Sequence, residues 1–286
     1  MNAATHSLLA LFWKALKRLF ADEAIPLAGN FAFRMIFSLF PFLIFLTSLA
    51  GFFGSEDLAS RVVTYLLDVA PADLVRPFAN EIRSILTVPR TGLLSIAVLI
   101  TLWSAMGGVD SVRIGLNRAY GVTETRPVWL LFLIDLVFVI TGAVLMLVFS
   151  VLLVAVPAIS AYVETYEPQW QLHISTLEPF RVPLAVLLAA FGLFVAHRFL
   201  PNLRLRPRHV WPGILLTVIV WVLITVAFAW YLQNFNSFAS TYASLSGLFA
   251  SMFLIYQAGL VMIFGGEVNR VLMIYRGHSP AIEAAE

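Results

Sequence analysis

The sequence lacks cysteine altogether and carries little charge. Without cysteine the chain forms no disulfide, no thiolate nucleophile and no cysteine-ligated metal site. Charged residues make up only 12% of the 286 residues, where a soluble domain usually has roughly twice that fraction. No two of its five histidines share the i, i+4 spacing of a hydrolytic metal site. We therefore expect neither a metal nor any other cofactor.

Apolar residues, in contrast, make up 60% of the chain, and the mean hydropathy is +0.90. They gather in six runs, each near the ~20 residues that a helix needs to cross a hydrocarbon core of ~30 Å. The runs cover residues 31–53, 91–109, 128–156, 181–200, 211–233 and 244–265. This pattern predicts an all-α, polytopic transmembrane helical bundle, with residues 1–286 forming a single membrane domain.

The distribution of cations between the runs predicts the orientation of the chain. Arginine and lysine precede the first run and lie between the second and third, between the fourth and fifth, and after the sixth. The segment 157–180 has acidic residues but no Lys or Arg, and the segment 234–243 has no charge. The positive-inside rule then places both termini in the cytoplasm. Because the cations form no continuous patch, nucleic acid is not an expected partner.

Two further segments have helical amphipathic patterns but are too short to span. Residues 8–20 place apolar side chains on one face and Lys14, Lys17 and Arg18 on the other, which predicts a helix in the cytoplasmic interface with its cations near anionic headgroups. The segment 54–90 repeats apolar residues at helical spacing on both sides of Pro71. It predicts two short amphipathic helices on the outer face.

Several polar residues fall in or beside the runs, where they are costly and therefore candidates for function. Six of them fall towards the predicted cytoplasmic side: Arg34, Asp110, Arg113, Asn117, Glu267 and Asn269. One interpretation is a polar cluster at the inner mouth of the bundle, and the other is a set of interface-anchoring ion pairs. Asp135 and Gln257 lie deeper within the membrane. An unpaired carboxylate would cost ~2.5–3.5 kcal/mol there, so Asp135 should face a donor or be protonated.

Small residues recur every fourth position in two of the runs. Gly107, Ser111 and Gly115 form one stripe, and Ala243, Gly247 and Ser251 form another. Such stripes allow close helix–helix contact within the bundle or between copies of the chain. They are also compatible with helices that line a central cavity.

Motifs along the chain resemble those of the YihY/BrkB family of bacterial inner-membrane proteins. They include Phe199-Leu200-Pro201-Asn202, Trp211-Pro212-Gly213, Tyr242-Ala243-Ser244-Leu245 and Gly265-Gly266-Glu267-Val268-Asn269, with an opening motif that ends at Pro41. The resemblance covers residues 25 to 272 and implies six spans, an inner-membrane location and a link to serum resistance. It also implies a suggested role in export of lipids or other envelope components. An older label describes the family as a tRNA-processing ribonuclease. That activity needs metal ligands or placed acid–base pairs, and this sequence offers neither.

The leading functional hypothesis is a non-enzymatic transport or translocation component for a lipid or amphiphile. It follows from apolar spans whose polar groups lie at the two ends, without a nucleotide-binding motif. The alternative is a scaffold that anchors an envelope complex through the segment 54–90. Expected partners are membrane lipids, with self-association or an envelope partner protein as open alternatives.

Overall fold

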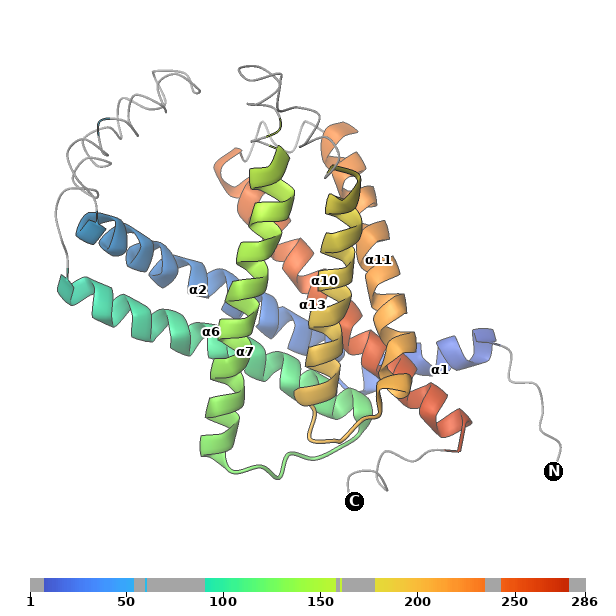
Figure 1. The fold of residues 1–286 in the computed structure, drawn as a ribbon. Coiled ribbons are helices and arrows are strands. Elements are labelled where there is room, and N and C mark those ends of the chain that lie inside the picture. Colours follow the sequence, from blue (N-terminus) through green and yellow to red (C-terminus); the bar gives the residue numbers. More distant parts are fainter. Residues whose placement is uncertain are drawn as a thin grey trace, which may run out of the picture. The chain divides into compact units, whose positions relative to one another are not determined.

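A computed structural model describes residues 8–53, 60, 91–157, 160, 178–234 and 243–277. All regular structure in this part of the chain is helical, as the apolar periodicity predicts. The helices are α1 (Leu8–Ala21), α2 (Ala24–Phe53), α6 (Thr91–Tyr120), α7 (Val128–Ser150) with a π-helical turn η2 (Val151–Ala155), α10 (Glu178–Phe199), α11 (Pro207–Asn234) and α13 (Ala243–Tyr275) (Figure 1). The predicted outer-face helices of segment 54–90 lie outside the described residues, and so does the scaffold alternative that rests on them.

Four of these helices are long and apolar enough to cross a membrane. The candidate spans are Val128–Leu153, Pro179–Phe199, Pro207–Tyr231 and Leu248–Tyr275. None of the most apolar stretch of α7 is buried within the protein, and such a surface is stable only against lipid. The chain is therefore an integral membrane protein. The predicted runs 31–53 and 91–109 lie within α2 and α6, and the count of six spans and the cytoplasmic position of both termini stay predictions.

The chain divides into two compact units, one formed by Met1–Phe33 with Met106–Glu286 and the other by Arg34–Ala105. In the first unit α11 packs along α13, α10 packs on α11, and α1 packs on α13 (Figure 1). Its core joins Leu116 and Tyr120 of α6 to Leu200, Ile214 and Met273. All of the contacts described below lie within this unit.

Two helices of the first unit extend beyond the predicted runs. The start of the fifth run was predicted at residue 211, but α11 begins at Pro207, because proline suits a first helical position, where its missing N–H has no partner to lose. Pro212 consequently lies in the second turn of α11. The sixth run was predicted to end at residue 265, but α13 continues to Tyr275. Its polar residues, including Glu267 and Asn269, are therefore inside a helix and not at its end.

A glycine ends α6 and fixes the direction of the following loop. Gly121 has a positive φ of 69°, the left-handed conformation that commonly ends helices. A Cβ at this position would overlap the guanidinium of Arg270 on α13. Arg270 in turn points towards the carbonyl oxygens of Arg118 and Ala119 at 3.5 Å, so the C-terminal turn of α6 is packed against α13.

Candidate functional site

Asn269 on α13 is a fully buried polar residue of the first unit, and its side chain joins three helices. Its Oδ1 accepts a hydrogen bond from the Gly213 N–H at 2.7 Å. Its Nδ2 donates to the Val210 carbonyl oxygen and to the Tyr120 hydroxyl, both at 3.0 Å. The side chain is 0% exposed. Because every one of these groups is buried, the three bonds replace those that water would otherwise supply.

Tyr120 extends this set of contacts to a fourth helix. Its hydroxyl lies 2.9 Å from Nδ1 of His197 on α10. Burial raises the pKa of Tyr120, so the phenol is neutral and carries one proton. The hydroxyl accepts from Asn269 and can donate its proton to His197 Nδ1, an arrangement that places the imidazole proton on Nε2, for which the structure gives no hydrogen-bond partner. Tyr120, His197, Gly213 and Asn269 are called the motif hub below.

Glycine makes the motif hub possible by bringing α11 and α13 into contact. A Cβ on Gly213 would overlap the Gly265 carbonyl oxygen and would lie 2.6 Å from Asn269 Nδ2. A Cβ on Gly265 would overlap the Thr217 hydroxyl and lie 2.9 Å from the Gly213 carbonyl oxygen. Such close backbone approach is how helices associate where no hydrophobic effect drives them together.

One turn from the hub, Glu267 of α13 binds the first helix of the chain. Its carboxylate is fully buried, and Oε2 accepts a hydrogen bond from Arg18 Nε at 2.8 Å. Arg18 Nη2 also donates to Asp22 Oδ2 at 3.0 Å. Removing one partner of a buried ion pair costs more than the pair itself contributes, since it leaves a lone charge. Arg18 therefore fixes α1 to the bundle.

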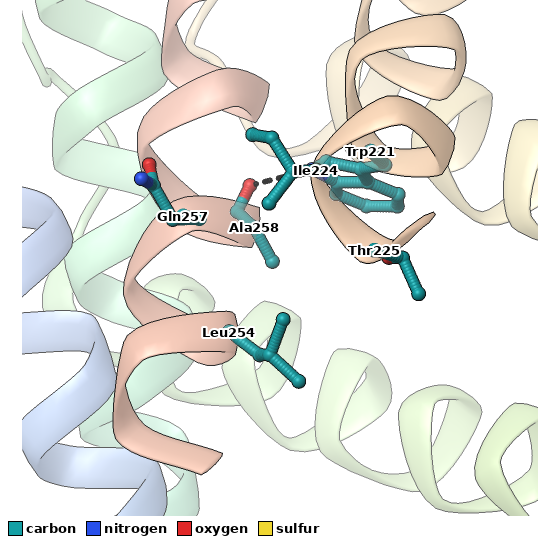
Figure 2. A pocket seen from close by; sticks show the side chains of 6 residues that line it. All are labelled: Trp221, Ile224, Thr225, Leu254, Gln257 and Ala258. Atoms are coloured by element: carbon teal, nitrogen blue, oxygen red, sulfur yellow. Dashed lines mark hydrogen bonds between the residues drawn. The ribbon is translucent and has the colours of Figure 1, made fainter. Parts of the chain in front are cut away.

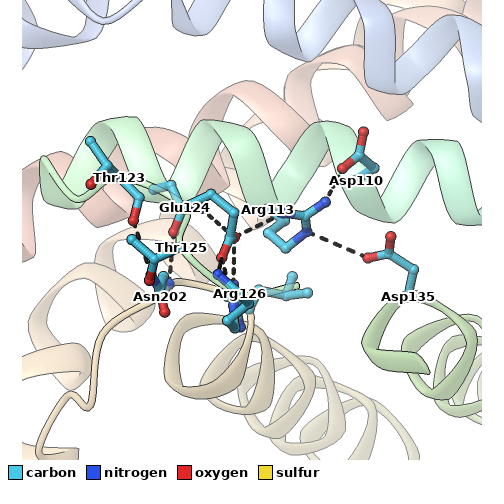
Figure 3. Close-up of polar contacts among 10 residues, drawn as sticks. Asp110, Arg113, Thr123, Glu124, Thr125, Arg126, Asp135 and Asn202 are labelled. Atoms are coloured by element: carbon cyan, nitrogen blue, oxygen red, sulfur yellow. Dashed lines mark hydrogen bonds and ion pairs between the residues drawn. The ribbon is translucent and has the colours of Figure 1, made fainter. Parts of the chain in front are cut away.

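A second set of polar residues is centred on Glu124, in the loop between α6 and α7 (Figure 3). Its Oε2 accepts from Arg113 Nη1 at 2.9 Å, from Asn117 Nδ2 at 3.0 Å and from Arg126 Nη2 at 2.7 Å. Its Oε1 accepts from Arg126 Nε at 2.8 Å. Burial by itself would raise the pKa of Glu124, but the hydrogen bonds from Arg126, Asn117 and Arg113 outweigh it and lower the pKa to about 2.

Arg113 connects this loop to two further carboxylates. It pairs with Asp110 one turn earlier on α6, and its Nε lies 3.6 Å from Asp135 Oδ1 on α7. The Arg113 side chain is 6% exposed and that of Asp135 is 9% exposed. Asp135 thus faces a cation within the bundle, so its carboxylate has a charged partner in place of lipid.

Asn202 joins the loop between α10 and α11 to the same residues. Its backbone N–H donates to Asn117 Oδ1 at 2.8 Å, and its Nδ2 donates to the Thr123 carbonyl oxygen at 2.9 Å and to Thr125 Oγ1 at 2.8 Å. The set is called the loop network below. Its members are Asp110, Arg113, Asn117, Glu124, Arg126, Asp135 and Asn202.

The structure divides the six residues of the predicted polar cluster. Asp110, Arg113 and Asn117 belong to the loop network, whereas Asn269 belongs to the motif hub and Glu267 to the contact with α1. No hydrogen bond or ion pair that the structure describes joins the loop network to the motif hub. Arg34 belongs to the second compact unit. The functional role of these residues stays a prediction.

Several central residues were absent from the sequence-based set. Glu124, Arg126, Tyr120, His197 and Arg18 all complete contacts of predicted residues. Glu124 lies 11 residues from Arg113 in sequence, so helical spacing cannot connect the two. A search for an acceptor near Asn117 and Arg113 in the short loop that follows α6 would have found it.

A cavity of about 210 Å³ lies between α11 and α13, further along the same helix pair (Figure 2). It is lined by Trp221, Ile224, Thr225, Leu254, Gln257 and Ala258. The Trp221 Nε1–H donates to the Ala258 carbonyl oxygen at 3.2 Å across the two helices. We call it the helix cavity. It contains Gln257, one of the two predicted intramembrane polar residues.

Comparison with known proteins decides the family. The family described as "Virulence factor BrkB" matches residues 15–285, nearly the whole chain. This chain belongs to the BrkB family. The YfkH protein of Bacillus subtilis, described as ribonuclease-like, is 29% identical over 266 residues, which cover 90% of this chain and 94% of YfkH. A UPF0761 membrane protein of Alteromonas mediterranea is 24% identical over 271 residues, 93% of this chain and 88% of its own. No solved structure gives a significant match.

The BrkB-family motifs quoted from the sequence can now be placed. Asn202 belongs to the loop network, and Gly213, Gly265 and Asn269 form the close contact between α11 and α13. Pro201 is buried beside Asn202 and Pro212 precedes the glycine of the contact. Tyr242 lies outside the described residues, and the side chains of Pro41 and Ser244 lie outside them too. The placed motifs are therefore concentrated where helices and loops of the first unit are joined.

Proposed function

We propose that this BrkB-family protein moves a lipid or another amphiphile of the cell envelope across or within the inner membrane, without catalysing a reaction. The observation that supports the proposal is the helix cavity, which lies between two candidate spans and has both apolar side chains and the polar residues Thr225 and Gln257 in its lining. Lipids have this same combination of a polar group and apolar chains. The inner membrane is part of the proposal, through the resemblance of the motifs.

The depth of Gln257 favours a polar ligand group at the helix cavity. It lies nine residues into the candidate span Leu248–Tyr275, or about 14 Å at the α-helical rise of ~1.5 Å per residue. It forms no hydrogen bond with any residue that the structure describes. A fully buried amide without a partner costs about 1–3 kcal/mol, and Gln257 is half-buried, so a ligand headgroup would remove part of such a cost.

The size of the helix cavity limits what it can hold. A volume of about 210 Å³ corresponds to roughly seven water molecules at ~30 Å³ each, enough for a headgroup but not for a whole lipid. The acyl chains would stay on the neighbouring outer surface of α11, where Leu223 and Val226 are more than 60% exposed. An amphiphile could then keep its chains in the bilayer while its polar group passes through the protein.

A non-enzymatic role is consistent with the burial of the polar residues that could otherwise act as acid or base. Tyr120 and His197, the nearest to an acid–base pair, are fully buried and bonded to one another, so no substrate reaches them. Among the residues that the structure describes, no three His, Cys, Asp or Glu side chains are grouped to hold a metal ion. The ribonuclease-like description belongs to YfkH and is not part of this proposal.

The test uses the purified protein in vesicles that contain a fluorescent phospholipid analogue. We expect faster movement of the analogue between leaflets than in protein-free vesicles, and a severalfold slower rate for Ala258→Leu, which fills the helix cavity. Ala227→Leu is the matched control, since it makes the same change on an exposed position of α11 that does not line the cavity. Absence of movement under every imposed gradient, or equal rates for the two variants, would contradict the proposal.

A further inference from the structure

The first helix, α1, presents three different surfaces around its circumference. One surface packs on the bundle, with Ala15 0% and Leu19 6% exposed. Arg18 borders this surface and is bound to Glu267 and Asp22. In Figure 1, α1 lies across the end of the first unit at which α13 ends.

The second surface is aromatic. Trp13 is 57% exposed and Phe20 is 61% exposed. They are seven residues apart, so at 3.6 residues per turn they lie one above the other along the helix. Large exposed aromatic side chains are stable at the membrane interface, where the ring contacts acyl chains and the indole N–H stays hydrated.

The third surface is basic and lies next to the aromatic one. Lys14 and Lys17 are both exposed, and they are three positions apart in the helix, so they share a face of α1. The Lys17 ammonium lies 5.9 Å from the centre of the Trp13 ring, which joins the two surfaces. They are the only two lysines in the whole sequence. Every other basic side chain apart from histidine is an arginine.

We propose that α1 binds anionic phospholipid headgroups, through Lys14 and Lys17, while Trp13 and Phe20 enter the acyl boundary of the same leaflet. The structure changes the set of residues that the sequence pattern favours. The pattern placed Arg18 with the two lysines, but Arg18 is occupied by a buried carboxylate and is absent from the lipid-binding surface. Phe12 is 44% exposed, and its ring also packs edge-on against Phe264 of α13 at a centroid distance of 5.5 Å.

The charge of the surface identifies the occupant. Two ammonium groups without an acidic neighbour on their own face attract a phosphate-bearing anionic surface, and the adjacent aromatic line matches the acyl boundary beneath it. A soluble anion would use the lysines but not the aromatic side chains. A zwitterionic bilayer would accept the aromatic side chains but would not attract the lysines. The proposal is independent of whether the protein moves lipids.

The two lysines provide a direct test, because an uncharged amine-reactive reagent modifies only Lys14, Lys17 and the α-amino group. The full-length protein is placed in nanodiscs of phosphatidylcholine, with or without phosphatidylglycerol, and labelling is read by mass spectrometry. We expect labelling of both lysines to fall about threefold or more with the anionic lipid and to recover at high salt, since salt screens surface charges. Equal labelling in both lipids would overturn the proposal, because it would show that the two lysines are either covered by protein or exposed to solvent whatever the lipid.

Variants that remove equal charge distinguish lipid binding at α1 from a general attraction between the cations of the protein and anionic lipid. Lys14→Gln/Lys17→Gln should co-purify with several times less phosphatidylglycerol than the wild type. Arg204→Gln/Arg206→Gln removes two exposed cations from the loop between α10 and α11 and should leave the amount unchanged. Arg18→Gln should lower the unfolding temperature and leave lipid retention intact. Equal losses of lipid in the lysine and the arginine pairs would overturn the assignment to α1.

Discussion

The antiparallel helices α11 and α13 meet in two different ways along their length. At the motif hub, Gly213 and Gly265 bring the two backbones into contact, and Asn269 is bonded on both of its amide atoms. Two turns further along α11, the same helices leave a cavity of about 210 Å³ beside Trp221 and Gln257. One end is packed and fully hydrogen-bonded at the Asn269 amide, and the other has free volume and an amide, Gln257, with no hydrogen bond to a described residue.

The difference indicates that the two ends of this helix pair have different roles. Close packing and satisfied buried polar groups favour a single rigid arrangement, because any displacement leaves polar groups without partners. A cavity within lipid-facing helices permits side chains to move and a ligand group to enter. The BrkB-family motifs that the structure places lie at the rigid end or in the loop network, so these motifs identify the framework of the protein, and no residue that lines the proposed ligand site belongs to a quoted motif.

The largest expected effect comes from removing the glycine contact at the motif hub. Gly213→Ala places a methyl group against the Gly265 carbonyl and the Asn269 amide, neither of which can move without breaking the helix or the hub. We expect a loss of about 4 kcal/mol in the free energy of unfolding, measured by thermal or denaturant unfolding in detergent.

The matched control for that change is Gly142→Ala on α7. A Cβ at this position meets nothing within 4 Å. Alanine is the better helix former, so the control should be as stable as the wild type or more stable by up to about 1 kcal/mol. If both alanine variants unfold alike, the close contact of α11 with α13 is not what stabilises the rigid end.

The next effect comes from the Asn269 amide. Asn269→Leu keeps a similar volume but leaves the Gly213 N–H, the Val210 carbonyl and the Tyr120 hydroxyl with one partner fewer. Buried groups without partners cost about 1–3 kcal/mol each and are not additive, so we expect a loss of about 3 kcal/mol. Tyr120→Phe should cost less, because two of the Asn269 bonds survive. A larger loss for Tyr120→Phe than for Asn269→Leu would place the centre of the hub elsewhere.

The loop network gives the stability of the folded protein a pH dependence. The pKa of Glu124 is about 2 in the folded protein, against ~4.3 when unfolded. The unfolded chain therefore binds more protons in this window, so stability rises with pH, is complete above about pH 5 and is lost as the pH falls towards 2. Since the side chain is 23% exposed, we expect a contribution of only about 1 kcal/mol.

Glu124→Gln tests this pH dependence. The variant should be less stable than the wild type at pH 7, and the difference between the two should narrow between pH 5 and pH 3 in unfolding measurements. Glu23→Gln removes a carboxylate that is 63% exposed and pairs with Arg118, and it is the control. A constant difference across the pH range would show that Glu124 contributes through its shape and not its charge.

The sequence predicts the helices of this molecule better than its polar contacts, for physical reasons. Apolar runs must be helical in lipid, because every backbone group has to be bonded within its own segment. That rule predicts α7, α10, α11 and α13 directly. It does not predict partners: Arg113 binds Glu124 across a loop, and Asn269 binds a backbone N–H 56 residues away, and both depend on how helices cross. The sequence did identify Asn269 and Gln257 as polar residues in costly positions, without indicating that Asn269 is fully hydrogen-bonded and that Gln257 has no hydrogen bond to a residue in the described part of the chain.

The smallest expected effect on stability is the one that tests the comparison most directly. Gln257→Leu removes a polar group that has no partner among the described residues, so the free energy of unfolding should change by less than about 0.5 kcal/mol or should rise. Movement of the fluorescent phospholipid analogue should nevertheless slow, because a headgroup would lose its hydrogen-bonding partner inside the helix cavity. Asn269→Leu is the converse: it should lose stability, and the protein that remains folded should move the analogue at the normal rate. If Gln257→Leu instead destabilises the protein as Asn269→Leu does, the amide is part of the framework, and the two ends of the helix pair do not differ in the way that the cavity indicates.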